Sequence, residues 1–103
     1  MKQNVSVFIE YKVVNRPEQY EILMQEISKE LLTAYDASHH RWFQAVDQPG
    51  LYVEWLEVGN KATYERIKSE RRDRDHPVFG QLAAHIHKPL ETINCWAFNE
   101  KRL

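Results

Sequence analysis

The spacing of apolar residues changes several times along the chain, and the order of these changes constrains the fold more than any single motif. Residues 5–14 alternate β-branched or aromatic residues with polar ones, a pattern typical of a strand. Apolar residues then recur at helical spacing from Tyr20 to Tyr35, after Pro17, which suits the first turn of a helix. The first part of the chain is therefore predicted to be a strand followed by a long helix.

A β-hairpin and a second helix are predicted next. Two apolar runs, residues 39–46 and 51–58, are separated by Asp47-Gln48-Pro49-Gly50, which has the composition of a turn. Asn60 can cap a helix that begins at Lys61, and Pro77 should break or kink that helix. Residues 90–98 form the last predicted strand.

This order of elements predicts an α+β fold of ferredoxin-like βαββαβ order, with an antiparallel sheet and both helices on one face. A chain of 103 residues is expected to form one domain, residues 1–103. Cys95 is the only cysteine and the N-terminus has no signal-peptide or membrane-span pattern, so a cytoplasmic location is expected. The net charge of -1 argues against nucleic acid as a partner, and no membrane partner is expected.

Each strand has two faces because its side chains alternate. One face is nearly all apolar and is assigned to the helix side: Val5, Val7, Ile9, Tyr11, Arg41, Phe43, Ala45, Leu51, Val53, Trp55, Ile93, Cys95 and Ala97. The other face is aromatic and polar, and it includes Phe8, Glu10, His40, Trp42, Tyr52, Glu54 and Trp96. A slip of one residue in the hairpin would exchange the two faces of its strands.

The aromatic and polar face predicts a homodimer. Two helices on the opposite side cannot cover it, and a large exposed aromatic patch usually marks an interface. Two sheets would pack face to face, with Trp42, Glu54 and Trp96 in the interface. Glu10 and Glu54 would find hydrogen-bond partners there, or would form an acid–base pair.

The hairpin carries a resemblance to a known family. The segment Arg41-Trp42-Phe43-Gln44-Ala45-Val46-Asp47-Gln48-Pro49-Gly50-Leu51-Tyr52-Val53-Glu54-Trp55 is similar to the strand, Asp-Pro turn and strand of the antibiotic-biosynthesis-monooxygenase-like proteins, in the dimeric α/β-barrel superfamily. His76-Pro77-Val78-Phe79 resembles that family's break in the second helix. The resemblance implies a dimeric α/β barrel whose pocket lies between sheet and helices, with Trp55 lining it.

The candidate site follows from this resemblance and the predicted faces. Trp55 and Tyr11 would bind a planar aromatic substrate, Arg41 would hold an oxygen substituent, and His85 would transfer protons. Alternatively, Trp55 fills the core and Arg41 extends to the sheet edge. No metal site is expected, because His39 and His40 point to opposite faces and the pair His85 and His87 diverges on a helix.

Two functions are expected from these residues. The first is a small monooxygenase-like protein that acts on a planar aromatic substrate without a metal or an organic cofactor. The alternative is a non-catalytic dimeric domain that binds a small molecule or a protein. Haem binding is a third hypothesis and rests on His85 and the aromatic residues. The run from Lys68 to Asp75 alternates in charge and predicts a solvated helix face.

Overall fold

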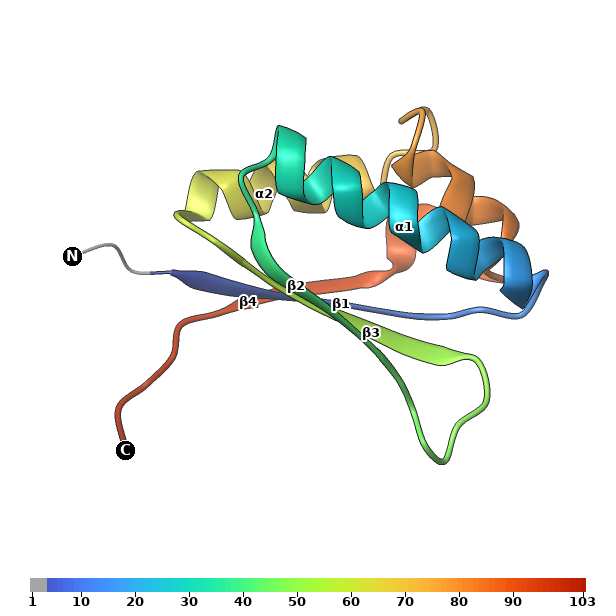
Figure 1. The fold of residues 1–103 in the computed structure, drawn as a ribbon, viewed down its shortest axis with the longest axis horizontal. Helices are drawn as coiled ribbons and strands as arrows, with labels where there is room; N and C mark the ends of the chain where they lie inside the picture. The colour runs from blue at the N-terminus through green and yellow to red at the C-terminus, as the bar shows by residue number, and fades with distance from the viewer. Residues whose placement is uncertain (1–3) are drawn as a thin grey trace.

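The computed structural model describes residues 4–103 and contains one four-stranded antiparallel sheet in the order β2-β3-β1-β4. The strands are β1 (Val5–Lys12), β2 (Ser38–Gln44), β3 (Leu51–Val58) and β4 (Asn94–Phe98). The helices are α1 (Pro17–Ala34) and α2 (Lys61–Arg71), with two 3-10 helices, η1 (Phe79–Ala84) and η2 (Leu90–Thr92). All helices lie on one side of the sheet (Figure 1). The predicted ferredoxin-like α+β fold is confirmed.

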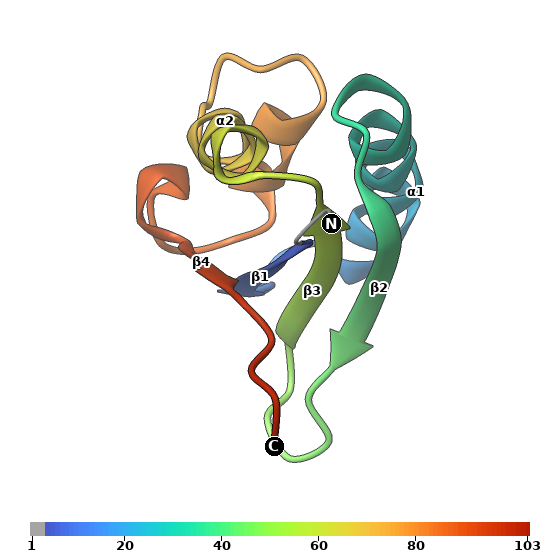
Figure 2. The ribbon, with the colours of Figure 1, turned by 90° about the vertical axis from the view of Figure 1, so that its left-hand side faces the viewer.

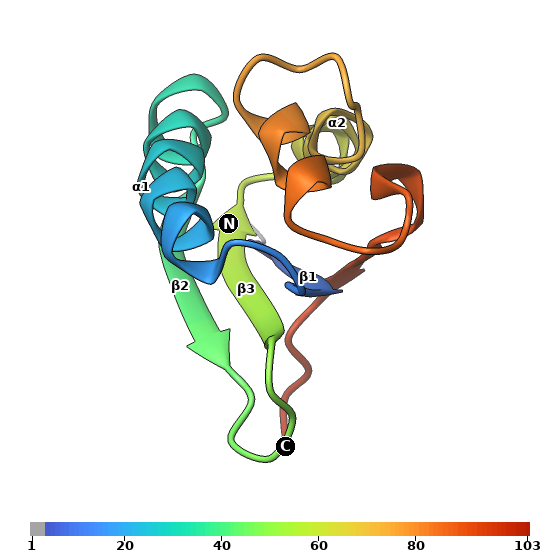
Figure 3. The same ribbon diagram turned by 90° about the vertical axis from the view of Figure 1, so that its right-hand side faces the viewer.

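The two helices divide the sheet between them. Figure 2 and Figure 3 show α1 on the side of β2 and α2 on the side of β4. None of the helices in residues 4–103 has the length and apolar character needed to cross a membrane. Residues 1–3, which entered the expectation about a signal peptide, lie outside the described residues.

Helix α1 forms as its apolar stripe predicts. Pro17 opens the helix, directly after Arg16 in a left-handed conformation. One face is buried against the sheet, and its residues are Tyr20, Leu23, Met24, Ile27 and Leu31. Burying each of these side chains contributes ~1.5–3 kcal/mol, which more than offsets the unfavourable nucleation of a helix.

Helix α2 begins where predicted but ends earlier. The Asn60 side chain accepts a hydrogen bond from the Thr63 backbone N–H at 2.8 Å, as a helix cap does. The helix ends at Arg71, well before Pro77, so the break does not depend on the proline. The run from Lys68 to Asp75 is therefore not one solvated helix face, and Arg71 within it is fully buried.

The hairpin strands present the opposite faces from those predicted. Ile9 pairs directly with Glu54, and Phe8 pairs with Trp55. Directly paired residues lie on the same face, so Glu54 points to the helices and Trp55 points away from them. The assignment of β1 and β4 holds, because Val7, Ile9 and Cys95 are in the core.

The prediction for the hairpin was wrong for a physical reason. It assigned Trp55 to the helix side because that set of strand residues is nearly all apolar, and this left Glu54 on the other face, where a buried carboxylate would need a partner. The partner exists but comes from α2, far along the chain. The pairing of β2 with β3 is irregular between Ser38 and Arg41, where His39 has a left-handed conformation. Beyond this irregularity β2 pairs in register with β3, so the faces of β2 are exchanged as well.

The sheet therefore has an uncovered side, which we call the open face. Its residues are Ser6, Phe8, Glu10, Arg41, Phe43, Val53, Trp55, Glu57, Asn94, Trp96 and Phe98. Three of its aromatic residues are about half exposed in the single chain: Phe43 (48%), Trp96 (58%) and Phe98 (53%).

Candidate functional site

A buried ion pair joins the sheet to the second helix. The Arg71 guanidinium donates to both carboxylate oxygens of Glu54, with Nη1–Oε1 at 2.6 Å and Nη2–Oε2 at 2.7 Å. Both side chains have an exposed fraction of 0%. Such a two-point contact is the geometry in which a guanidinium binds a carboxylate most strongly. The ion pair therefore fixes α2 on β3.

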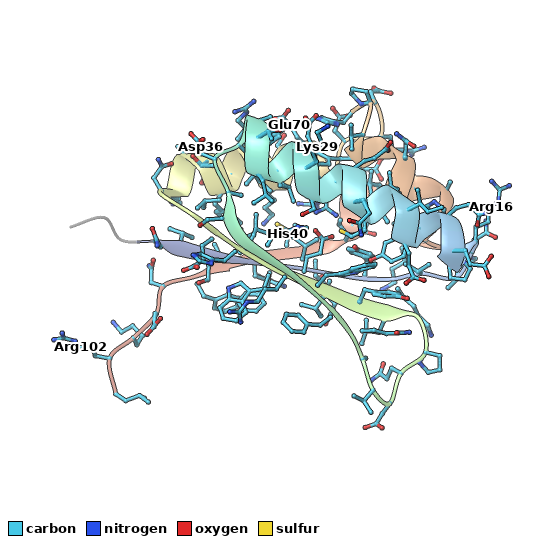
Figure 4. The ribbon with its side chains drawn as sticks, in the orientation of Figure 1. Arg16, Lys29, Asp36, His40, Glu70 and Arg102 are labelled. Carbon is cyan, nitrogen blue, oxygen red and sulfur yellow. The ribbon has the colours of Figure 1, made fainter. Side chains whose placement is uncertain are left out.

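Two further groups donate to the same carboxylate. The Nε2 atom of His40 lies 2.8 Å from Oε1 of Glu54, and the Tyr11 hydroxyl donates to Oε2 at 2.6 Å. In Figure 4, His40 lies between the sheet and the helix layer. The other ring nitrogen of His40 lies 2.7 Å from the Ser28 hydroxyl on α1. The carboxylate thus receives donors from β1, β2 and α2.

The hydroxyl protons of this cluster have one consistent direction. Tyr11 gives its only hydroxyl proton to Glu54, so Tyr20 must donate to Tyr11 across their 2.7 Å contact. Trp42 donates its indole N–H to the Tyr20 oxygen at 2.8 Å. A chain of donors therefore runs from Trp42 through both tyrosines to the carboxylate. We call the group Tyr11, Tyr20, His40, Trp42, Glu54 and Arg71 the polar cluster.

The surroundings in the polar cluster shift the pKa values of Glu54 and Tyr11. Burial opposes ionisation of Glu54, but the attraction of Arg71 and the hydrogen bonds from His40 and Arg71 outweigh it, so the pKa of the carboxyl is lowered. Burial first, and then the charge of Glu54, raise the pKa of Tyr11 above its ordinary value. Both pKa shifts oppose proton exchange at neutral pH, so neither Glu54 nor Tyr11 is suited to act as the acid or the base of a reaction.

The four predicted site residues do not come together. Tyr11 faces the helices as predicted. His85 lies on that side too, with its Nδ1 atom 2.9 Å from the Asn15 carbonyl oxygen. Arg41 and Trp55 are neighbours as predicted, with the guanidinium 5.2 Å from the indole centroid, but they lie on the open face. There Trp55 stacks on Phe8 at 5.4 Å, so the predicted stacking position for an interior substrate does not exist.

Two of the three residues predicted for the dimer interface do not lie on the open face. Glu54 is inside the protomer, and Trp42 packs on Tyr20 and Tyr52 on the helix side. Both corrections follow from the exchanged faces of the hairpin. Trp96 does lie on the open face and is exposed there.

A cavity lies at the edge of the sheet beside β1. The pairing between β1 and β4 stops at Glu10 and Asn94, and the chain returns to β1 only at the bridge between Val13 and Ile86. The gap between these contacts opens into a cavity of about 440 Å³, which we call the edge cavity. It is lined by Glu10, Tyr11, Lys12, Val14, Leu51, Ile86, His87, Lys88, Thr92, Ile93 and Asn94.

A second, shallower hollow of about 510 Å³ lies on the open face and is lined by Phe8, Glu10, Val53, Trp96 and Phe98. Its residues belong to the aromatic surface described above. Within residues 4–103, no three His, Cys, Asp or Glu side chains are grouped so that they could hold a metal ion.

The sequence contained an unused signal for Arg71. Tyr64 and Ile67 face the core, and Arg71 follows at the next helical position on the same side. An arginine in an apolar stripe indicates a buried acid opposite it. The lining of the edge cavity had no such signal, because its residues come from four separate segments.

Comparisons with known proteins identify solved structures with a similar fold. No known family profile matches the sequence, and no curated protein sequence matches it. Among solved structures, the chain is similar to SnoaB, a cofactor-independent oxygenase from Streptomyces nogalater. The TM-score is 0.74 at 14% identity, over 98% of this chain and 96% of that one. It is also similar to a conserved protein from Methanosarcina mazei Go1, with a TM-score of 0.68 at 17% identity, over 97% and 95% of the two chains. Both similarities extend over nearly the whole chain and support the predicted fold of the single chain.

Proposed function

We propose that this protein is a small oxygenase that acts on a planar aromatic substrate without a metal or an organic cofactor. The observation that carries the proposal is the edge cavity, in a chain with the fold of a cofactor-independent oxygenase. Its volume of about 440 Å³ falls in the range of small-molecule sites. Its lining combines the aliphatic residues Val14, Leu51, Ile86 and Ile93 with Tyr11 and with polar and charged residues.

The chemistry balances without an added reductant. A phenol with a hydrogen on its para carbon can react with dioxygen to give a quinone and water. One oxygen atom becomes the new carbonyl, and the other leaves as water with two hydrogens from the substrate. The substrate supplies all the electrons that reduce dioxygen, so the protein needs only to bind, to orient and to help remove a proton.

The lining offers groups for these tasks. Tyr11 lines the edge cavity and keeps its predicted role in substrate binding. His87 lines the edge cavity, and an imidazole can take a proton from a phenol. The catalytic role of His85 stays a prediction; the residue is not in the lining of the edge cavity, and its ring lies beside that of Tyr20. Arg41 and Trp55 have no part in the proposed site.

One observation favours the alternative, a binding domain without catalysis. The carboxylate and phenols of the polar cluster are all hydrogen-bonded to one another, so none of them is free to act on a bound molecule. In that case the edge cavity would hold a ligand without changing it.

Oxygen uptake on a panel of phenols and hydroquinones separates the two functions. With the phenols of the panel, the oxygenase predicts uptake with one labelled atom from labelled dioxygen in the quinone product; the hydroquinones detect oxidation without incorporation, in which dioxygen is reduced to hydrogen peroxide. Val14 lines the edge cavity and is exposed, so Val14→Trp should fill it and lower kcat/KM about tenfold or more. The matched control Ile22→Trp, at an exposed site on α1, should leave kcat/KM unchanged. Absence of uptake with every compound in the panel would contradict the oxygenase.

We also propose that two chains associate through their open faces. The half-exposed aromatic residues Phe43, Trp96 and Phe98 support this, because an aromatic surface of this size is rarely left in water. The interface would contain Trp55 and Arg41 in place of Glu54 and Trp42.

A further inference from the structure

Within residues 4–103, the lining of the edge cavity holds more basic than acidic side chains, and no ion pair involves its two lysines. Lys12 and Lys88 both line the cavity, and neither takes part in an ion pair. The only acid in the lining is Glu10, and its carboxylate accepts a hydrogen bond from the Asn94 side chain at 3.1 Å. With His87 beside Lys88, the basic groups outnumber the acidic one.

The wall of the same cavity is apolar. Val14, Leu51, Ile86 and Ile93 contribute aliphatic side chains. Tyr11 is also in the lining, and its hydroxyl is already hydrogen-bonded to Glu54 and Tyr20 in the polar cluster. A ligand that fills this space must be apolar over most of its surface and can be charged only at the rim.

We propose that the edge cavity selects aromatic compounds that carry a carboxylate, with the ring against the apolar wall and the carboxylate between Lys12 and Lys88. Lysine ammonium groups act as point charges with rotatable donors, so they can meet a carboxylate whose position varies between ligands. The inference names the substrate class of the proposed oxygenase, a hydroxylated aromatic acid, and rests on that function for its use in catalysis. Binding itself is measured without turnover.

The polar cluster holds one residue of the cavity lining, Tyr11, in a fixed position. Tyr11 is held by two hydrogen bonds of 2.7 Å and 2.6 Å, and its partner Glu54 is held by Arg71. A fixed ring lowers the entropy lost when a flat ligand packs on it. The cluster therefore shapes the site without touching the charged end of the ligand.

Calorimetric titration with 2-naphthoate and its neutral analogue 2-naphthalenemethanol tests the inference. The wild-type protein should bind naphthoate more tightly, and the difference should shrink as salt is added. Lys12→Met and Lys88→Met should each weaken naphthoate binding about fivefold, as the loss of an exposed charge contact does, and leave the neutral analogue unchanged. Lys29→Met, at an exposed site on α1, should change neither affinity.

The variant Val14→Trp, which fills the edge cavity, should weaken the binding of both compounds because it removes the space for their rings. Equal affinities for the charged and neutral compounds in the wild-type protein would overturn the inference, as would lysine variants that leave naphthoate binding unchanged.

These experiments distinguish a failure of the carboxylate site from a failure of the proposed oxygenase. Charge-dependent binding without oxygen uptake on any phenol would refute the oxygenase and support the carboxylate site. Oxygen uptake that is equal for neutral phenols and their carboxylates, and is unaffected by both lysine variants, would support the oxygenase and refute the carboxylate site.

Discussion

Glu54 and Arg71 are the residues on which the arrangement of the core depends. An isolated buried charge is very costly, so each side chain can be buried only with the other in place. The pair is also the point where β1, β2, β3 and α2 meet, through Tyr11, His40, Glu54 and Arg71. A change at one of these positions acts on four elements at once.

Removing one charge of the pair should be worse than removing both. Arg71→Met should lower the free energy of unfolding by ~3–5 kcal/mol, because it leaves the Glu54 carboxylate buried and unpaired. The double variant Glu54→Leu with Arg71→Met should recover a large part of that loss. Urea unfolding followed by circular dichroism measures both values. A single variant as stable as the wild type would show that the pair does not form.

The pair should also give the protein a specific response to acid. The pKa of Glu54 is lower in the folded state, so its contribution to stability is complete above the ordinary carboxyl pKa of ~4.3 and is lost as the pH falls through the folded value. Below about pH 4, the free energy of unfolding of the wild type should therefore fall relative to that of the double variant. Urea titrations from pH 7 to pH 3 measure it, and a difference independent of pH would contradict this role.

At the scale of the elements, the hairpin is held by its turn as well as by its strands. Gly50 has φ of 82°, in the region that favours glycine, and a Cβ there would lie 2.4 Å from the Val13 carbonyl oxygen. The Gly50 carbonyl itself accepts a hydrogen bond from the Val13 backbone N–H at 2.7 Å. The turn therefore packs directly on the end of β1, beside the edge cavity.

Gly50→Ala should lower the free energy of unfolding by ~2 kcal/mol or more, since strain and a backbone clash add. Gly59→Ala is the matched control, because no atom lies within 4 Å of the added Cβ. Thermal unfolding of the two variants gives the comparison. Equal effects would mean that the turn is free to move away from β1.

At the scale of the whole molecule, the open face is the side of the sheet that no helix covers. Light scattering at micromolar concentration should give about twice the chain mass. Trp96→Asp should reduce it to the mass of one chain, because it places a charge in an apolar interface. Ile22→Asp, at an apolar site on the outer side of α1 that is 68% exposed, should leave the dimer intact. A wild-type protein that scatters as a single chain would refute the dimer.

Local patterns in the sequence determined most of the architecture. The stripe from Tyr20 to Leu31 formed α1, Asn60 capped α2, and the residues 51–58 formed β3, because these features depend on neighbours a few positions away. The faces of β1 and β4 were also predicted correctly, since one side of each is clearly apolar. The end of α2 was not predicted, because Pro77 was taken as the residue that breaks the helix, whereas the helix ends earlier, at Arg71.

The faces of the hairpin were decided by the tertiary structure alone. In the sequence, Glu54 and Trp55 belong to alternate faces of the strand, and the apolar character of the set that contains Trp55 favoured the wrong face for the helix side. Arg71, contributed by α2, reverses that balance by pairing with Glu54 in the core, and the whole hairpin turns with it. The edge cavity likewise exists only because four distant segments leave a gap beside β1. Local periodicity specifies the elements, whereas a pairing between distant charges specifies which side of them faces inward.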